Sequence, residues 1–180
     1  MQFKIIAAQD LDKKQRQQIA ELSFAAFEED PWSQYAFMQK AIHVVGILNE
    51  KIVSHALWTD RIFTINGSVS VKTAYVEYVT TDYEMRGKGL ASQLLRYLAD
   101  ALTDLEYGLA ALQPEDEAFY KKLGWTTWWG DLYIKQDAST YLTDDYEIML
   151  YPLSTKVKKL LSHSSEKDTI CADWREGEPW

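Results

Sequence analysis

A short loop with two glycines, residues 86–91 with the sequence RGKGLA, joins an apolar segment to a strongly periodic one. The apolar run 74–79 before the loop is typical of a buried strand. The segment after it repeats leucine on one helical face, at Leu90, Leu94, Leu95, Leu98 and Leu102. Glycine lets a backbone curve closely around a ligand, and the first N–H groups of a helix have no partner within it. This order predicts a cradle for an anion such as a pyrophosphate; an ordinary strand-to-helix turn with a solvated arginine and lysine is the alternative.

The spacing of the glycines excludes the two commonest nucleotide-binding loops. A Walker loop needs four residues between its first glycine and a Gly-Lys-Ser/Thr sequence, which this chain lacks. A dinucleotide fingerprint would have its third glycine at Ser92, within a βαβ repeat that the chain does not otherwise show. The pattern that does fit is Arg-x-x-Gly-x-Ala, from Arg86 to Ala91.

Composition and charge limit the domain organisation and the partners. The chain has 180 residues, 47% of them hydrophobic and 26% charged, which fits one globular domain over residues 1–180. Its formal net charge is −8 and its pI is near 4.9. Because binding to nucleic acid needs a basic face, the charge argues against a nucleic-acid partner and favours a cationic small molecule.

Cysteine, histidine and hydropathy give further limits. The single cysteine, Cys171, excludes an intramolecular disulfide and suits a reducing compartment. His43, His55 and His163 are scattered without metal-ligand spacing, so we expect no metal site. The N-terminal sequence does not resemble a secretory signal, and no apolar run is long enough to span a membrane. We therefore expect a cytoplasmic protein with no membrane partner.

The hydrophobic pattern predicts a mixed α/β order. Asp10 is expected to cap a first helix, which the acidic residues 28–30 and Pro31 end. Asn49-Glu50 is expected to form a tight turn, and Asn66-Gly67 is a strong hairpin signal. Strands are expected at residues 2–7, 42–48, 52–65, 68–79, 107–112, 126–134 and 147–151, and helices follow residues 89 and 114. This is not the order of a doubly wound nucleotide-binding fold.

A second motif lies in residues 118–125, with the sequence AFYKKLGW. Its pattern directs Phe119 and Leu123 toward the core and ends a helix at Gly124 in a left-handed turn. Tyr120 is either a packed amphipathic side chain or a residue whose hydroxyl has a role. The glycine loop upstream favours a role for the hydroxyl.

Together these motifs resemble those of the GNAT acetyltransferases. The loop 86–91 resembles motif A, whose amides hold the pyrophosphate of coenzyme A, and residues 119–125 resemble the Phe-Tyr-x-x-x-Gly-Phe segment of motif B. The resemblance implies the GNAT fold, an α/β (α+β) class with a mixed, mostly antiparallel central sheet, flanked by helices and splayed at the acetyl-CoA site. Residues 74–77, residues 124–130 and above all the ending 173–180, DWREGEPW, resemble the aminoglycoside 2'-N-acetyltransferases.

The resemblance implies a catalytic role for Glu77. Strand alternation puts Glu77 on one face with Tyr75 and Val79, and carboxylates are seldom buried without a purpose. In the family this glutamate lies beside the acceptor amine and takes its proton through water. Burial raises the pKa of a carboxyl, which makes it a better base toward an ammonium group. A structural ion pair with a nearby lysine or arginine is the alternative.

In the implied mechanism the neutral amine attacks the thioester of acetyl-CoA directly, so Cys171 is not needed as a nucleophile. The backbone from Tyr78 to Thr81 would align the pantetheine arm, and an N–H near Val79 would polarise the carbonyl. Tyr120 would protonate the leaving thiolate. The implied acetyl-CoA contacts are Val79, Thr80, Thr81, Arg86, Gly87, Lys88, Gly89, Leu90 and Ala91.

Specificity is expected from acidic groups, because an aminoglycoside carries several ammonium groups. The family pattern implies a substrate site formed by Asp30, Glu77, Tyr78, Asp144, Glu178 and Trp180. Trp180 would act through its terminal carboxylate, and residues 154–180 would form an extension that contributes to this site. Each acid taken alone is more simply a solvated surface charge.

The sequence thus predicts transfer of acetyl from acetyl-CoA to the 2'-amino group of aminoglycoside antibiotics, a resistance activity. A GNAT enzyme that acts on another polyamine or a peptide amine would keep Glu77 and Tyr120. An acyl-CoA-binding module without turnover would keep only the glycine loop. A homodimer is possible, because relatives in the family are often dimers.

Overall fold

The computed structural model describes residues 1–29, 32, 36–143, 145–176 and 180, and the expectations for Asp30, Asp144 and Glu178 lie outside these residues. The chain forms two compact units. Unit 1 comprises Met1–Thr59 and Val76–Leu98, and unit 2 comprises Asp60–Tyr75 and Ala99–Trp180. Strands β3 (Lys51–Ile65) and β4 (Val69–Thr81) and helix α3 (Leu90–Asp104) each contribute residues to both units.

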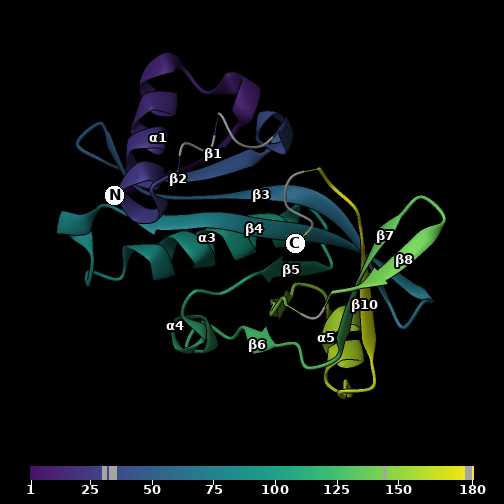
Figure 1. Ribbon diagram of the computed structural model, residues 1–180. Helices are drawn as coiled ribbons and strands as arrows, with labels where there is room; N and C mark the ends of the chain where they lie inside the picture. The colour runs from purple at the N-terminus through teal and green to yellow at the C-terminus, as the bar shows by residue number, and fades with distance from the viewer. Residues whose placement is uncertain (30–31, 33–35, 144, 177–179) are drawn as a thin grey trace. The chain divides into compact units, whose positions relative to one another are not determined.

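Unit 1 is built on antiparallel strands. β2 (Ile42–Leu48) pairs with β1 (Gln2–Ala7) on one side and with β3 on the other, and β4 follows β3. Helix α1 (Lys13–Phe27) lies over these strands in Figure 1. The apolar side chains that join the helix to the strands are Leu11, Ile19, Leu22, Val45 and Ile52. The expected strands 2–7 and 42–48 are confirmed.

The start of α1 differs from the expectation. Asp10 belongs to the 3₁₀ turn η1 (Ala8–Asp10), and the helix is capped by Asp12, whose carboxylate accepts the Gln15 N–H at 2.8 Å. The Gln15 side chain in turn accepts the Asp12 N–H, which completes a capping box. Leu11 is buried in extended backbone, so the helix begins only after this residue has entered the core.

Both predicted tight turns are confirmed by their backbone angles. Asn49 and Glu50, between β2 and β3, have φ of 48° and 63°. Asn66 and Gly67, between β3 and β4, have φ of 50° and 63°. Two successive positive φ angles are typical of the type I′ turn, whose twist matches that of the strands it joins.

Unit 2 holds a mixed sheet that continues from the other ends of β3 and β4. The added strands are β5 (Leu109–Leu112), β6 (Thr126–Thr127), β7 (Asp131–Gln136), β8 (Ser139–Leu142), β9 (Met149–Pro152) and β10 (Thr169–Asp173). Together with β3 and β4 they are ordered β6-β9-β5-β4-β3-β10-β7-β8. The pairs β4–β5 and β7–β10 are parallel and the other described pairs are antiparallel.

The parallel pairing of β4 with β5 is short. It joins Thr73–Tyr75 to Leu109–Ala111, whereas β4 continues to Thr81. This is the arrangement expected of a sheet splayed between these two strands. The mixed, mostly antiparallel sheet with flanking helices is the predicted fold class.

Three elements of unit 2 were not expected. The strand β8 is exposed along its whole length, so it carries no alternating pattern of apolar residues. Helix α5 (Thr155–Leu161) spans seven residues, begins at the cap Ser154 and buries Val157. β10 buries Ile170 and Ala172 against β3, opposite Ile65 and Phe63. The expected single strand 126–134 is divided into β6, which pairs with β9, and β7, which pairs with β10 and β8.

The two helices predicted after residues 89 and 114 form, with one difference. In α3 the stripe Leu90, Leu94, Leu95, Leu98 and Leu102 is buried. The short helix α4 (Glu117–Lys121) is capped by Asp116, and the turn after it has φ of 91° at Gly124. Its most buried residue is Tyr120, whereas Phe119 and Leu123 are only half-buried. No described helix has both the length and the apolar character to cross a membrane.

Candidate functional site

The glycine loop of unit 1 has the conformation that an anion cradle requires. Gly87 and Gly89 have φ of 75° and 71°, which residues with a side chain rarely adopt. A Cβ at either position would meet nothing within 4 Å, so the space above the loop is open. The first hydrogen bond of α3 runs from the Gln93 N–H to the Gly89 carbonyl at 3.1 Å. The N–H groups of residues 90–92 precede this bond, so they have no acceptor within the helix and lie at its positive end.

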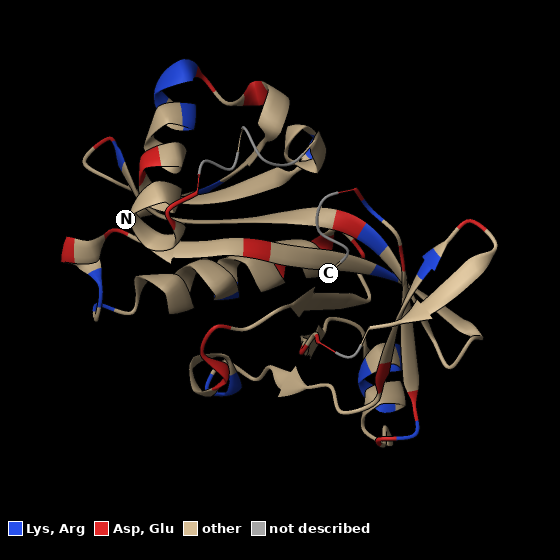
Figure 2. Ribbon diagram, viewed as in Figure 1, with Lys and Arg blue, Asp and Glu red and all other residues tan. Residues whose placement is uncertain are grey.

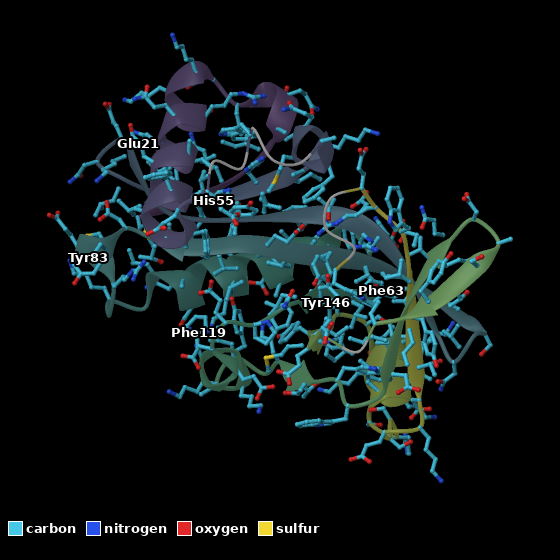
Figure 3. The ribbon with its side chains drawn as sticks, in the orientation of Figure 1. Glu21, His55, Phe63, Tyr83, Phe119 and Tyr146 are labelled. Carbon is cyan, nitrogen blue, oxygen red and sulfur yellow. The ribbon has the colours of Figure 1, made fainter. Side chains whose placement is uncertain are left out.

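The two cationic side chains of the loop lie against the 3₁₀ turn η3 (Tyr83–Met85). Arg86 donates from Nε to the Thr81 carbonyl at 3.3 Å, and its guanidinium lies over the Tyr83 ring. Lys88 donates from Nζ to the Glu84 carbonyl at 3.1 Å. Tyr83 lies at the exposed surface of unit 1 (Figure 3). The loop thus combines open backbone amides with two nearby positive charges.

An ion pair fixes the strand end that leads into the loop. The Asp82 N–H donates to the Val53 carbonyl at 2.9 Å, and Lys51 Nζ lies 2.6 Å from the Asp82 carboxylate. The same carboxylate accepts the Glu84 N–H at 3.1 Å. The hydrogen bond from Lys51 holds the pKa of Asp82 below its usual range. The end of β4 and η3 are therefore anchored to β3.

Strand β4 contains a bulge at Tyr78. The hairpin bond joins Ser68 to Ile65, and the bond at the other end joins Asp82 to Val53. β3 spans 12 residue steps between these bonds and β4 spans 14, so β4 holds additional residues. Tyr78 has φ of 52°, which marks where the strand departs from regular geometry. The regular strand geometry is therefore interrupted one residue before Val79.

Glu77 immediately precedes this bulge and is half-buried. It is the acidic position that Figure 2 shows within β4. The hydroxyl of the buried Thr59, on β3, is 3.5 Å from Glu77 Oε2. Sequence reasoning missed Thr59, because a threonine in a strand is common and nothing nearby in the chain distinguishes it.

A second carboxylate of unit 1 contacts the bulge. The Tyr78 hydroxyl donates to Glu29 Oε2 at 3.1 Å, and the Tyr78 ring packs edge to face against Phe27. Glu28 caps α1 with a left-handed φ of 59°, which turns the chain before Glu29. The sequence shows only three successive acids at this point, and among its described members Glu29 reaches the Tyr78 hydroxyl.

Two histidines that are distant in the sequence meet in unit 1. His43 Nδ1 and His55 Nε2 are 2.9 Å apart, and both side chains are fully buried. Burial lowers the pKa of His43 to about 4 and lowers the pKa of His55 strongly. His55 was expected to be satisfied or partly exposed rather than catalytic; it is buried and bonded to His43, so it is not exposed. No group of three or more potential metal ligands occurs among the described residues.

Tyr120 lies in unit 2, where its ring packs against Phe119 and Trp125. Burial, together with the nearby carboxylates of Glu115 and Asp116, raises the pKa of Tyr120 well above its ordinary value. The hydroxyl therefore stays protonated at neutral pH. The predicted pair Glu77 and Tyr120 belongs to two different units.

The C-terminal residue is built into the core of unit 2. The Trp180 indole is buried, packs edge to face on Phe63, and donates from Nε1 to the Thr143 hydroxyl at 3.0 Å. A terminal oxygen of Trp180 accepts a hydrogen bond from Arg175 at 3.2 Å. Phe63 is labelled in Figure 3. The structure thus places the ring in a packing role that the sequence analysis had not assigned to it.

The structure brings part of the predicted site together. Unit 1 contains Glu77, Tyr78, the backbone 79–81 and the loop 86–91, and it adds Thr59 and Glu29. Unit 2 contains Tyr120 and Trp180. Within unit 1, a half-buried carboxylate, a bulged strand and an anion cradle follow one another along the chain. This arrangement can bind a diphosphate and position a base beside the bulged strand.

Comparison with known families identifies the class of protein. Residues 4–128 match the family model of the acetyltransferase (GNAT) domain, so the chain belongs to the GNAT family. A comparison with curated protein sequences gives no match.

Solved structures of GNAT proteins share the fold. The chain is similar to the GNAT family N-acetyltransferase YhbS of Escherichia coli, determined in complex with CoA, with 15% identity and a TM-score of 0.64 over 98% of this chain and 92% of that one. Escherichia coli ElaA has 15% identity and a TM-score of 0.58 over 83% of this chain and 97% of that one. A probable N-acyltransferase of Enterococcus faecalis has 19% identity and a TM-score of 0.58 over 69% of this chain. The chain spans about a third of that protein, at 32% of its length, and likewise 34% of a Kribbella flavida GNAT protein.

Proposed function

We propose that this protein transfers the acetyl group of acetyl-CoA to the 2'-amino group of aminoglycosides, by direct attack within a ternary complex. The observation that carries the proposal is the arrangement in unit 1 of Glu77, the bulge at Tyr78 and the glycine loop. Membership of the GNAT family supports acetyl-CoA as the donor. The ending DWREGEPW and the acids near the bulge support the aminoglycoside as the acceptor.

The loop 86–91 would hold the diphosphate of acetyl-CoA. Its glycines leave the space in front of the backbone open, and the start of α3 presents N–H groups and a positive dipole end. Arg86 and Lys88 belong to the loop, lie against η3, and would add positive charge beside the diphosphate.

The bulge would polarise the thioester. Because Tyr78 is left-handed, the amide of Val79 leaves the regular ladder and can donate to the thioester carbonyl oxygen. The pantetheine arm would lie along residues 79–81 as an added strand. The Val79 N–H would then stabilise the negative charge that develops on the carbonyl oxygen during attack.

Glu77 would take the proton of the acceptor ammonium, directly or through water. The carboxylate lies one residue before the bulge, so a nucleophile held by Glu77 is close to a thioester held by Val79. The Thr59 hydroxyl contacts Glu77 Oε2 and would orient the carboxylate toward the substrate. The neutral amine attacks the carbonyl carbon, the C–S bond breaks to release CoA as its thiolate, and the new amide nitrogen loses its second proton to solvent.

Tyr120 would supply the proton to that thiolate. The raised pKa of Tyr120 keeps its proton in place until a base of sufficient strength forms nearby. An ordinary thiol has a pKa near ~8.5, so the transfer is uphill unless the thiolate is itself desolvated. We therefore propose that Tyr120 donates a hydrogen bond first and completes the transfer as CoA leaves.

Acceptor recognition would rest on carboxylates. Glu29, held by the Tyr78 hydroxyl, provides a fixed negative charge in the same unit as Glu77. The net charge of −8 attracts a polycation over a longer range. Asp30, Asp144, Glu178 and the terminal carboxylate of Trp180 remain proposed contacts from the family resemblance.

The test is turnover with matched acceptors. The protein is incubated with acetyl-CoA and tobramycin or gentamicin, which carry a 2'-amine, and with kanamycin A, which carries a 2'-hydroxyl. Thiol release is followed, and product NMR locates the acetyl group. The proposal expects turnover with the first two drugs, acetylation at the 2'-nitrogen, and little turnover with kanamycin A.

Other outcomes point to the alternatives. Acetylation of spermine or a peptide amine without acetylation of any aminoglycoside would contradict the proposed acceptor. Binding of acetyl-CoA in calorimetry without turnover of any amine would indicate an acyl-CoA-binding module.

A further inference from the structure

A cavity of unit 2 is formed by residues that the proposed reaction does not use. Its volume is about 790 Å³, which is within the range of pockets that hold small molecules. The start of β4, the end of α3, residues 106–108 and helix α5 line it, and all of its described lining residues belong to unit 2. Glu77 and the glycine loop belong to unit 1. The cavity is therefore built from other residues than the site proposed for acetyl transfer.

The floor of the cavity is apolar and tightly packed. Four side chains that belong to the core of unit 2 or pack against it form this floor: Val69, Val71, Val157 and Leu160. A Cβ on Gly108 would lie 2.7 Å from Val71 Cγ1, so glycine lets the segment before β5 approach β4 this closely. A hydrocarbon chain bound here would exchange contact with water for contact with these side chains, which is favourable.

Backbone hydrogen bonds around Gly108 hold the walls of the cavity. The Gly108 N–H donates to the Lys72 carbonyl at 2.9 Å, and the Gly108 carbonyl accepts the Leu153 N–H at 3.0 Å. The Ser154 hydroxyl accepts the Val157 N–H at 3.2 Å and caps α5. One residue therefore ties β4 to the segment that leads into α5, so the walls are fixed by main-chain bonds.

Three exposed lysines form a cationic rim, which comprises Lys72, Lys156 and Lys159. The Lys72 ammonium is held in place, because it donates to the Leu105 carbonyl at 3.1 Å and lies 4.0 Å from the centre of the Tyr107 ring. The Tyr107 hydroxyl in turn donates to the Asp60 carboxylate. An ammonium group has three protons, so Lys72 keeps donors for a ligand.

The charge of the lining is opposite to that of the whole chain. The cavity has three lysines and one carboxylate, that of Glu106, in a protein with a net charge of −8. Figure 2 shows basic positions on α5. Within the described part of the chain, Lys156 and Lys159 have no salt-bridge partner. The rim therefore favours an anion and disfavours a polycation such as an aminoglycoside.

The rings of the lining favour an aliphatic ligand over a nucleobase. Tyr107 is the one phenol, phenyl or indole ring among the described lining residues; it is buried, and Lys72 lies over it. Bases are bound by stacking on accessible aromatic rings. Branched aliphatic side chains suit a flexible hydrocarbon chain instead. The floor and the rim together therefore select an amphipathic anion with an aliphatic body.

We propose that this cavity binds an aliphatic monocarboxylate, with its hydrocarbon chain on the apolar floor and its carboxylate on the cationic rim. Lys72 donates to the carboxylate from its held ammonium, and a lysine of α5 adds a second charge-assisted hydrogen bond. This site is additional to the proposed acetyl transfer and does not depend on it.

Calorimetry with octanoate tests the proposal, with 1-octanol and octylamine as probes of the same chain length. We expect octanoate to bind in a one-to-one ratio and more tightly than 1-octanol, and octylamine to bind most weakly. Lys72→Met keeps the length of the side chain and removes its charge, so it should weaken octanoate binding about tenfold and leave 1-octanol binding unchanged. Lys158→Gln is the matched control, because Lys158 is an exposed lysine of α5 outside the cavity lining.

NMR of ¹⁵N-labelled protein locates the ligand. Amide resonances of residues 69–72, 106–108 and 153–160 should shift on addition of octanoate, and those of residues 86–91 should not. The measurement needs neither acetyl-CoA nor turnover, so failure of this proposal and failure of the proposed acetyl transfer are distinguishable. The double variant Lys156→Gln with Lys159→Gln should also weaken octanoate binding and serves if Lys72→Met does not fold.

Four outcomes would overturn the proposal. The first is that octanoate does not bind. The second is equal octanoate affinity in Lys72→Met, the double variant and Lys158→Gln, because this would indicate hydrophobic adsorption without a carboxylate site. The third is a set of shifts confined to residues 86–91, which would assign octanoate to the acetyl-CoA site. Tighter binding of 2-naphthoate than of octanoate is the fourth, since it would contradict the aliphatic body.

Discussion

The Tyr78 hydroxyl donates a 3.1 Å hydrogen bond to Glu29, and this bond links the bulge of β4 to the segment that follows α1. The two residues are 49 positions apart in the chain. Through this bond, the Glu29 carboxylate is held beside the strand that carries Glu77, where it can bind a cation. The proposed acceptor site and the proposed thioester site of unit 1 therefore share one residue.

Removal of the negative charge of Glu29 should weaken acceptor binding selectively. We expect Glu29→Gln to raise the KM for tobramycin roughly tenfold or more, since hydrogen bonds to charged groups contribute about 1.5–3 kcal/mol. The KM for acetyl-CoA should stay the same. Steady-state kinetics with each substrate varied in turn measures this, with Glu106→Gln, an exposed acid of unit 2, as the control. Equal increases in both KM values would contradict the assignment.

Loss of the proposed base should change both rate and pH profile. Glu77→Gln is expected to lower kcat by about 10²–10⁴, the usual contribution of a general base. The loss should be largest at low pH, because the free amine becomes more abundant as the pH rises. Thiol release measured from pH 6 to 9 checks this. A profile parallel to that of the unsubstituted protein would show that Glu77 is not the base.

Tyr120 should act on the departure of CoA and not on its binding. We expect Tyr120→Phe to lower kcat by about 10²-fold while the KM for acetyl-CoA changes little. The ring contacts with Phe119 and Trp125 are retained in this variant, so the fold should be preserved. Stopped-flow measurement of thiol release, with calorimetry of CoA binding, gives both quantities. A variant as active as the parent would return Tyr120 to a packing role.

Trp180 should contribute to stability as well as to any substrate contact. The indole is buried against Phe63 and bonded to Thr143, so Trp180→Ala is expected to lower the free energy of unfolding by about 3–5 kcal/mol. Trp180→Phe should cost less, because it keeps most of the ring. Urea denaturation measures both. If Trp180→Ala unfolds at the same urea concentration as the parent, the C-terminal ring does not stabilise unit 2.

The histidine pair should make stability depend on pH. The pKa of His43 is about 4 in the folded protein and 6.5 without the fold, so the unfolded chain binds more protons between these values. His43 therefore favours unfolding progressively as the pH falls from 6.5 to about 4, by roughly 3 kcal/mol in total. His55 acts in the same direction.

Urea denaturation at pH 7, 5.5 and 4.5 measures this effect, with His43→Phe compared at each pH. Carboxylates titrate in both proteins, so the difference between the two slopes isolates the histidine. We expect a shallower loss of stability in His43→Phe. Parallel pH dependence in the two proteins would show that His43 is not held neutral by burial.

The local signals in the sequence were sufficient for most of unit 1. Two-residue turns such as Asn66-Gly67 specify backbone angles directly, and the leucine stripe of α3 specifies a buried helical face. Gly87 and Gly89 are needed at positive φ, so their positions mark the loop before any fold is known. Such features follow from the properties of a few adjacent residues.

The elements that were missed lack these signals. β8 is exposed on both faces, and β10 becomes a strand through pairing with β3 and β7, which lie far from it in the chain. The break between β6 and β7 depends on their different partners, β9 for the first and β10 and β8 for the second. A strand that forms because of a distant partner leaves little pattern in its own residues.

The sequence by itself determined the family-typical fold, the glycine loop and the position of Glu77 in a strand, because short-range sterics and hydrophobic periodicity act within a few residues. Only the tertiary structure decided that Glu29 reaches Tyr78, that His43 meets His55, and that the Trp180 ring is buried. These contacts join residues 12 to 117 positions apart, and their geometry depends on how strands pair and how side chains fill the space between them.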